Sequence, residues 1–509
     1  MRKYISRTHA ASNNLRASVA GIFINIILSF FSRRIFVMVL GKEYVGLSSL
    51  IGNITVLLSL ADFGAASAVV FHLYKALSKK DHTTVSQYLS CYHSFCRLSA
   101  FITVVCGAAL LPHLSSFVKD FDDLPALRFA FCIYICSCAL GYFFSREQIL
   151  LFADQKNYVV QLFSFVFGAI STAAECAVLI FTRNYIVYLC THSLIVFSCD
   201  LALAVHVRKT YPEICFSSKL TCPYHQKKLL LREMLFLQPS NISGTLLRTV
   251  DNFLVVSLFG VAANGIYSNY NMLLGYASML SVTLISALSA SVGNLSASES
   301  KEKSEKIFYL TSTASFFLIN ICTCLLFAMS QDIISLWLGN SLSLPHSVSA
   351  ILAANFFITA LRRTPLIFRD SFGLYKYEKI KPFAELLASV ILSVFFGKRM
   401  GMGGIYLGQA MSAFFVCLFY EPYILFCHGF EKSVFPYYAR MIKYGFVSFL
   451  SCVMCYFACR YLPLFSLRFV VCLFVPCAIF FIFFFSSGET KRIMGMILKS
   501  PKSYSTKHE

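Results

Sequence analysis

The chain has 509 residues, of which 57% are hydrophobic and only 13% charged, with 44 Lys and Arg against 24 Asp and Glu. A soluble globular protein is nearer 45–50% apolar and about 25% charged, so this composition excludes a water-soluble enzyme with one core, and equally a disordered or fibrous chain. Each membrane span needs roughly 20 apolar residues, which leaves room for about 14 spans.

Hydropathy and the positions of loop-forming residues predict an all-α polytopic membrane protein with about 14 transmembrane helices. The first apolar segment follows a basic N-terminus and has no small-residue cleavage site, so it is expected to be a retained span. In chain order, the predicted spans are 17–39, 46–72, 91–112, 125–150, 157–181, 185–206, 233–258, 264–292, 307–329, 346–368, 382–397, 404–427, 439–460 and 467–486.

The loops between these spans alternate in their content of basic residues. With the N-terminus and every second loop placed on one side, that side and its flanking helix ends carry 29 Lys and Arg, whereas the other side carries 7. The positive-inside rule makes the basic side cytoplasmic. Both termini are therefore predicted to be cytoplasmic, and because the loops are short, the function is expected among the helices.

One glycine motif occurs twice. Gly41 and Gly46, at the end of the first span, recur as Gly260 and Gly265, 219 residues later. This offset equals six spans, so the seventh span restarts in the orientation of the first, as in transporters built from parallel repeats. We predict an N-terminal six-helix bundle (1–207), a cytoplasmic linker (208–232), a C-terminal six-helix bundle (233–427), and two additional helices with a cytoplasmic tail (428–509).

Twenty cysteines raise the question of a disulfide framework or a metal site. Eighteen of them fall in apolar segments, and close pairs such as Cys452 and Cys455 have no neighbouring His or second pair. We interpret them as small apolar helix residues and predict no metal site; metal or redox chemistry stays the alternative.

Seven short segments, spread over nearly the whole chain, carry a family resemblance. They are RIFVMVLGKEYVGL at 34–47, LADFG at 60–64, DN at 251–252, GIYSNY at 265–270, ASVGN at 290–294, FRDSFGL at 368–374 and EPY at 421–423. They resemble the Wzx-type polysaccharide repeat-unit flippases (O-antigen, capsule or teichoic type) of the multidrug/oligosaccharidyl-lipid/polysaccharide exporter superfamily.

The resemblance implies two pseudo-repeated six-helix bundles plus two C-terminal helices around a central cavity, in the bacterial cell (inner) membrane. It implies a transporter that works by alternating access and moves oligosaccharide units linked to undecaprenyl pyrophosphate from the cytoplasmic to the outer leaflet, for surface polysaccharide such as lipopolysaccharide or capsule. A polysaccharide polymerase and other assembly proteins are implied as partners. No enzyme activity, cofactor or nucleic-acid partner is expected.

Arginines within the predicted spans suit a pyrophosphate cargo. An arginine near the bilayer centre costs roughly 2.5–3.5 kcal/mol and usually faces the bundle interior, and its planar fork fits phosphate oxygens. Arg34 and Arg248 are predicted to form a clamp from opposing halves, while Arg33 either joins them or reaches towards the membrane surface. Alternatively, Arg248 pairs with Asp251. Three further arginines lie near the inner ends of their spans: Arg97 in the third, and Arg362 and Arg363 in the tenth. They either guide the head group into the protein or contact phosphates of the inner leaflet.

Carboxylates in the spans are candidates for H+ or Na+ coupling, or for ion pairs with arginines. They are Asp62, Asp251, Glu175 and Asp200. ATP is not expected to drive transport, because the chain has no Gly-rich phosphate loop that ends in Lys-Ser or Lys-Thr.

Other functions remain open at this point. A lipid-linked peptidoglycan precursor flippase would use the same pyrophosphate chemistry. A multidrug or cation antiporter of the same superfamily would favour acidic cavity residues over arginines. A membrane glycan polymerase would need a sizeable external loop, which the sequence lacks, and a non-transporting scaffold would tolerate loss of any single membrane arginine.

Overall fold

The computed structural model describes residues 21, 24–59, 65–114, 126–216, 223–298, 301–378 and 380–491. Within these ranges the chain is almost entirely helical and has no strand, which confirms the all-α prediction. The candidate coupling residue Asp62 lies outside the described residues. The chain forms two compact units, Met1–Ser268 and Asn269–Glu509, called unit 1 and unit 2 below.

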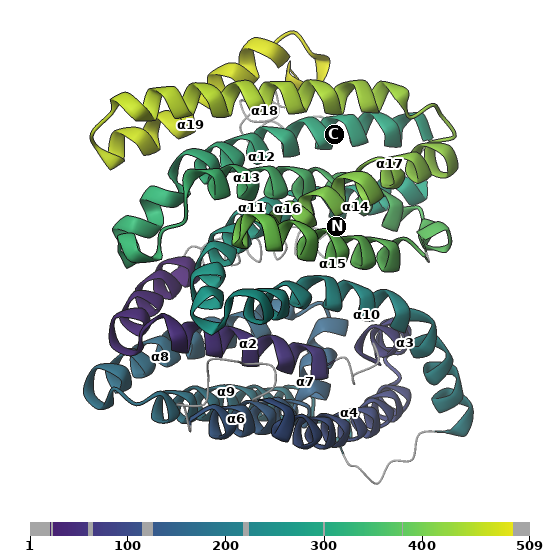
Figure 1. Cartoon of the computed structure of the whole chain (residues 1–509). Coiled ribbons are helices and arrows are strands. Elements are labelled where there is room, and N and C mark those ends of the chain that lie inside the picture. Colours follow the sequence, from purple (N-terminus) through teal and green to yellow (C-terminus); the bar gives the residue numbers. More distant parts are fainter. Residues whose placement is uncertain are drawn as a thin grey trace, which may run out of the picture. The chain divides into compact units, whose positions relative to one another are not determined.

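Unit 1 begins with a helix over residues 24–40 and continues through helices that pack side by side (Figure 1). They are α2 (Lys42–Leu58), α3 (Ala65–Ser78), α4 (His82–Leu110), α6 (Ala126–Gly141), α7 (Ser145–Ala153), α8 (Asn157–Thr182), α9 (Tyr185–Thr210), α10 (Tyr224–Phe259) and the start of α11 (Val261–Ser298). Side-chain caps begin two of them: Asp81 accepts a hydrogen bond from Thr84 N (3.0 Å) and Asn184 one from Ile186 N (2.9 Å), so backbone donors at the helix starts are satisfied.

Two apolar cores hold unit 1 together. One joins α3, α4, α7 and the end of α9, and includes Leu150 and Val207, both fully buried. The other joins the helix at 24–40, α2, α6 and the beginning of α9, and includes Phe131 and Leu189. Helix α10 lies against α2 and α3 (Figure 1), so it groups with the N-terminal helices in this unit.

Unit 2 contains the rest of α11 and the helices that follow it. They are α12 (Lys301–Leu338), α13 (His346–Leu361), α14 (Arg363–Ser371), α15 (Lys381–Met400), α16 (Met402–Ser412), α17 (Tyr420–Ile424), α18 (Phe435–Tyr461) and α19 (Phe465–Phe484). Helix α12 packs against α13, α18 and α19, and α15 packs along α16 (Figure 1). Short π-helical segments, Ala413–Leu418 and Leu425–Phe430, lie on either side of α17.

Each of the fourteen predicted spans overlaps a helix or two adjoining helices. Nine helices in the described ranges are long and apolar enough to cross a membrane, or ten if a bent pair is one span; fourteen spans stays a prediction. The bent pair replaces one predicted span, 125–150: the helix breaks after Gly141 and turns by 47°. The predicted linker at 208–232 is shorter than expected, because α9 continues to Thr210 and α10 begins at Tyr224. Hydropathy detects only the apolar part of such a helix. Lys and Arg also have a high helix propensity, so the helix can continue beyond its apolar part.

The repeated glycine motif has the same geometry in both copies. Gly41 has φ 87° and ψ 175°, and Gly260 has φ 86° and ψ 175°. Both donate to the carbonyl four residues earlier, Val37 O at 3.0 Å and Val256 O at 2.9 Å. A positive φ is rarely adopted by residues with a side chain, so glycine is required at both turns.

The second glycine of each motif lets two helices cross backbone to backbone. A Cβ on Gly46 would lie 1.9 Å from Val261 O, and a Cβ on Gly265 would lie 2.1 Å from Lys42 O. The contact is reciprocal, because each glycine faces the residue four positions before the other. The fully buried Asn264 side chain donates to Gly46 O (2.9 Å) and fixes the crossing.

Candidate functional site: charged side chains within the helices

Arg33 and Glu175 belong to one polar cluster in unit 1. The charges of both act on the hydroxyls of Tyr134 on α6 and Tyr188 on α9. Glu175 is buried and accepts a hydrogen bond from His192 Nδ1 at 2.8 Å. The cluster therefore joins a predicted phosphate ligand to a predicted coupling residue.

The Glu175 carboxylate has two hydrogen-bond partners, one on the preceding turn of α8 and one on α9. Ser171 Oγ, one turn earlier on α8, donates to the same Oε1 atom as His192. Imidazole and carboxyl groups are the side chains that proton relays in membrane proteins use, so this pair is a candidate coupling site. Sequence reasoning missed His192, because its spacing from Glu175 along the chain has no regular relation to their contact across α8 and α9.

The two arginines of the predicted clamp have side chains exposed on unit 1. Arg34 lies on the helix at 24–40 and Arg248 on α10, and neither has an ion pair with another described residue. Arg34 precedes Gly41 by seven residues and Arg248 precedes Gly260 by twelve, about 10 and 18 Å along a helix. They belong to the same compact unit, at different depths.

Asp251 and Asp200 lie in different polar surroundings. Asp251 is buried on α10 beside Asn252, whose side-chain oxygen accepts from Ser49 Oγ on α2 at 3.1 Å. Asp200 is partly buried on α9 and accepts from Gln148 Nε2 on α7 at 3.0 Å. Asp200 and Glu175 are thus held by separate hydrogen bonds, the first to α7 and the second to α9.

Arg362, a predicted phosphate ligand, holds two carboxylates in unit 2. It lies at the break between α13 and α14 and donates from Nη1 and Nη2 to Glu385 (2.6 and 3.2 Å) and from Nε and Nη2 to Glu421 (3.0 and 2.7 Å). Both carboxylates are at most 7% exposed. A guanidinium with its fork filled in this way favours a structural role. The neighbouring Arg363 has an exposed side chain.

The ion pairs continue from Arg362 to the end of α14 and the start of α15. Lys381 Nζ bonds Glu421 Oε1 at 2.5 Å and Glu378 Oε2 at 2.9 Å. Arg369 pairs with the same Glu378 and with Asp370. Glu421 lies between two π-helical segments, which turn its carboxylate into this network. The network is charge-balanced where it is buried, so it needs no ligand to complete it.

A third charged cluster, around Glu147, was not predicted from the sequence. Glu147 is fully buried on α7, and its Oε1 accepts from Arg146 Nε (3.2 Å) and from Arg208 Nε and Nη2 (3.1 and 2.8 Å). Arg208 comes from the end of α9. The Phe216 ring lies 5.7 and 5.9 Å from the two guanidinium carbons. No spacing rule brings residues 61 positions apart to one carboxylate.

Comparisons with known proteins bear on the fold. No protein-family model and no curated protein matches the sequence. The lipid II flippase MurJ in an inward closed conformation is 13% identical, with a TM-score of 0.67 over 94% of this chain and 99% of MurJ. An inward-facing multidrug resistance MATE family transporter of the MOP superfamily is 11% identical, with a TM-score of 0.64 over 79% of this chain and 94% of that one. The Vibrio cholerae MATE transporter VcmN is 14% identical, with a TM-score of 0.56 over 84% and 99%.

At these identities the likeness establishes the fold. The chain has the all-α membrane-transporter fold of MurJ and the MATE transporters, and is a multi-pass membrane protein. The match to MurJ leaves roughly 30 residues unmatched, whereas α18 and α19 contain 27 and 20 residues. The two helices together are longer than the unmatched part, so the likeness to MurJ includes at least part of this C-terminal pair.

Proposed function

We propose that this protein is a flippase that moves an oligosaccharide linked to undecaprenyl pyrophosphate from the cytoplasmic to the outer leaflet of the bacterial inner membrane. The observation that carries the proposal is the likeness of nearly the whole chain, at least part of the C-terminal helix pair included, to the lipid II flippase MurJ. The sequence resemblance to polysaccharide repeat-unit flippases is the reason to propose an oligosaccharide as the cargo. The arginines within the helices are the groups proposed to bind its pyrophosphate.

Such a cargo sets the demands on the protein. The glycan and the pyrophosphate need a hydrated path, while the long lipid tail stays in the bilayer. Arg34 and Arg248 are the ligands we propose for the pyrophosphate, because both are exposed on unit 1 and have no ion pair with another described residue. Measured along their helices from Gly41 and Gly260, the two arginines differ by roughly 8 Å in depth. We propose that the pyrophosphate binds between them.

The energy source is bounded by the charge of the cargo. Moving one charge across 100 mV is worth about 2.3 kcal/mol, so an interior-negative potential favours moving a net charge of −2 outward by about 4–5 kcal/mol per 100 mV. An inward H+ or Na+ would add to this. We propose Glu175 with His192 as the first candidate for such coupling, since the carboxylate is buried and the two groups are hydrogen-bonded.

A lipid-linked peptidoglycan precursor is the second candidate cargo, and the likeness to the lipid II flippase favours it specifically. A multidrug or cation antiporter is the third candidate, favoured by the likeness to MATE transporters. The arginine pair argues against a cationic cargo, because like charges in a low-dielectric site repel.

The test is reconstitution of the purified protein into vesicles with a labelled lipid-linked oligosaccharide, followed by measurement of the fraction accessible in each leaflet. Protein-dependent equilibration is expected for the oligosaccharide lipid, and competition by unlabelled lipid II or by cationic drugs separates the three candidates. Equal rates in protein-free vesicles would refute the flippase.

Arginine variants test the pyrophosphate ligands in the same vesicles. Arg34→Ala or Arg248→Ala is expected to leave the labelled lipid in its starting leaflet, whereas Arg34→Lys keeps part of the activity because a cation remains. Arg128→Ala is the matched control, since Arg128 is also an exposed arginine in a predicted span but has no proposed role. Wild-type transport by both alanine variants would remove the clamp.

A further inference from the structure

The cluster around Glu147 has more positive than negative charge. Two guanidiniums, from Arg146 and Arg208, share the single Oε1 atom of Glu147, and the other oxygen, Oε2, has no hydrogen-bond partner among the described residues. Arg146 is only 8% exposed. Its two Nη groups make no hydrogen bond to a described residue. One carboxylate neutralises one arginine, so one positive charge is left over, and the 48% exposed side chain of Arg208 leaves it accessible to a ligand.

A third arginine, Arg97 on α4, lies one helical turn after His93. The charges of Arg146, Arg97 and Arg208 all act on the His93 ring, so the three guanidiniums lie within electrostatic range of one side chain. The side chain of Arg97 is exposed and has no ion pair with another described residue. Together with Glu147, the three arginines of α4, α7 and α9 have a net charge of +2.

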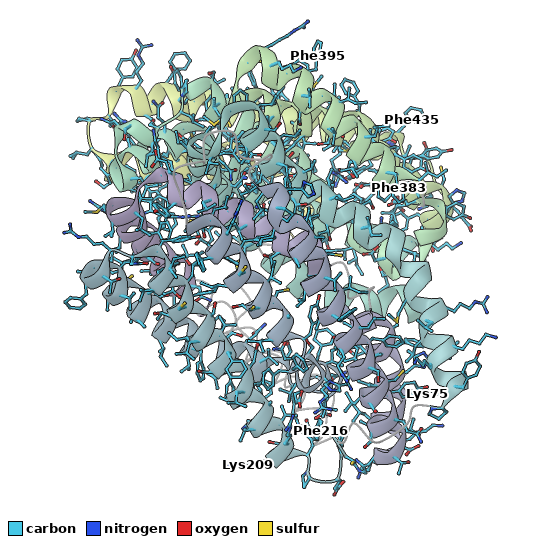
Figure 2. The ribbon with its side chains drawn as sticks, turned by 60° about the horizontal axis from the view of Figure 1, so that its bottom comes forward. Lys75, Lys209, Phe216, Phe383, Phe395 and Phe435 are labelled. Carbon is cyan, nitrogen blue, oxygen red and sulfur yellow. The ribbon has the colours of Figure 1, made fainter. Side chains whose placement is uncertain are left out.

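The segment after α9 completes the cluster. Its Ile214 is buried in the core that joins α3, α4 and α7, and Cys215 N donates to Ser86 Oγ on α4 at 3.0 Å. These contacts hold the Phe216 ring against both guanidiniums. Figure 2 shows Phe216 and Lys209 at the same end of unit 1. This end carries the predicted cytoplasmic linker.

A site with excess positive charge and two exposed arginines can attract an anion from solvent or from the membrane surface. Arg146 is almost removed from water, so an anion that reaches its two Nη groups would give them the partners they lack. Guanidiniums bind phosphate oxygens through paired, charge-assisted N–H···O bonds. A ligand with a phosphate or diphosphate group fits the charge of +2, whereas a cation or a neutral sugar does not.

We propose that Arg146, Arg208 and Arg97 form a binding site for the phosphate or diphosphate group of a lipid, distinct from Arg34 and Arg248. At the end of unit 1 that carries the linker, this site would hold the head group before it reaches the clamp. Its assignment to the transported lipid rests on the proposed function; the same chemistry would also accept an anionic phospholipid of the surrounding membrane.

The experiment measures binding of inorganic pyrophosphate to the full-length protein in neutral detergent at low ionic strength, where surface charges are least screened. Arg208→Gln keeps an N–H donor for Glu147 but removes the charge, and is expected to weaken binding about tenfold or more, as loss of one charge-assisted bond implies. Lys209→Gln is the matched control: it removes the same charge from the next, exposed residue of α9 and is expected to leave binding unchanged. Arg97→Gln, an exposed position, tests the site without disturbing the buried pair.

Competition identifies the source of the phosphate. A polyprenyl diphosphate that displaces pyrophosphate at lower concentration than phosphatidylglycerol assigns the site to the cargo; equal displacement assigns it to membrane phospholipid. Equal pyrophosphate affinity of the wild type, Arg208→Gln, Arg97→Gln and Lys209→Gln overturns the site. Transport in vesicles without this binding would refute the site alone, whereas binding without transport would refute the proposed function alone.

Discussion

The crossing of α2 and α11 at two glycines gives the sharpest test of the packing. A Cβ atom on Gly46 would lie 1.9 Å from Val261 O, whereas ordinary van der Waals contact begins near 3.4 Å. The helices must therefore separate by about 1.5 Å. Overpacking of this kind costs about 1–3 kcal/mol. Separation also strains the buried bond from Asn264 to Gly46 O, and an orphaned buried acceptor costs about 1–3 kcal/mol more. Gly46→Ala is therefore expected to lower the free energy of unfolding by roughly 2–6 kcal/mol.

The assay is equilibrium unfolding of the purified protein in detergent. The loss of helix content is measured instead of Trp fluorescence, because the chain has a single Trp. Gly52→Ala is the control. It lies on the same helix, and a Cβ there meets nothing within 4 Å. Without a clash, replacing a helical glycine by alanine stabilises by up to about 1 kcal/mol. The two substitutions should thus have opposite signs.

Reciprocity gives a second, independent outcome. Gly265→Ala forces apart the same two backbones, since its Cβ would lie 2.1 Å from Lys42 O. Once one methyl group has separated the helices, the other adds little, so the double variant should be less unstable than the sum of the single variants. Full additivity, or a Gly46→Ala variant as stable as Gly52→Ala, would refute the crossing.

Three further predictions concern charge and topology. Arg362→Gln should destabilise by about 3–5 kcal/mol in the same unfolding assay, because it leaves two buried carboxylates without their guanidinium, whereas Lys398→Gln at an exposed position should change little; equal effects would contradict the network. Glu175→Gln should make transport in vesicles insensitive to the pH or sodium gradient that affects the wild type, and an unchanged dependence would exclude it as a coupling site. Cys215 is exposed, so a membrane-impermeant maleimide should label it only from the cytoplasmic side, with Cys215→Ser as the control; labelling of intact cells would reverse the predicted orientation.

The sequence was informative wherever a one-dimensional pattern determines the structure. Runs of apolar residues located the helices, and the spacing of Gly41 and Gly260 located two turns with matching backbone angles. Both signals are local, since helix formation and a positive φ depend on neighbouring residues. The bend after Gly141 and the long start of α10 were missed because hydropathy records burial in lipid and not helix continuity.

The partners of the charged residues could not be predicted in the same way. Glu147 and Arg208 are 61 positions apart, and Arg362 and Glu421 are 59 apart. Such pairs depend on which faces of which helices meet, and adjacent arginines on one helix differ in direction by about 100°. Arg33 and Arg34 illustrate this: the first acts on tyrosines of α6 and α9, and the second is exposed.

The distribution of paired and excess charge separates the roles of the two units. In unit 2 the buried cations Arg362 and Lys381 are matched by buried carboxylates, so an anion arriving there would have to displace them, at the cost of leaving those carboxylates buried and unpaired. In unit 1, Arg34 and Arg248 have no ion pair among the described residues, and Arg146 and Arg208 share one carboxylate. An anionic head group gains most where positive charge is already in excess, so the contacts that hold the phosphate are expected on unit 1. The balanced network of unit 2 then serves to keep the break between α13 and α14 in place.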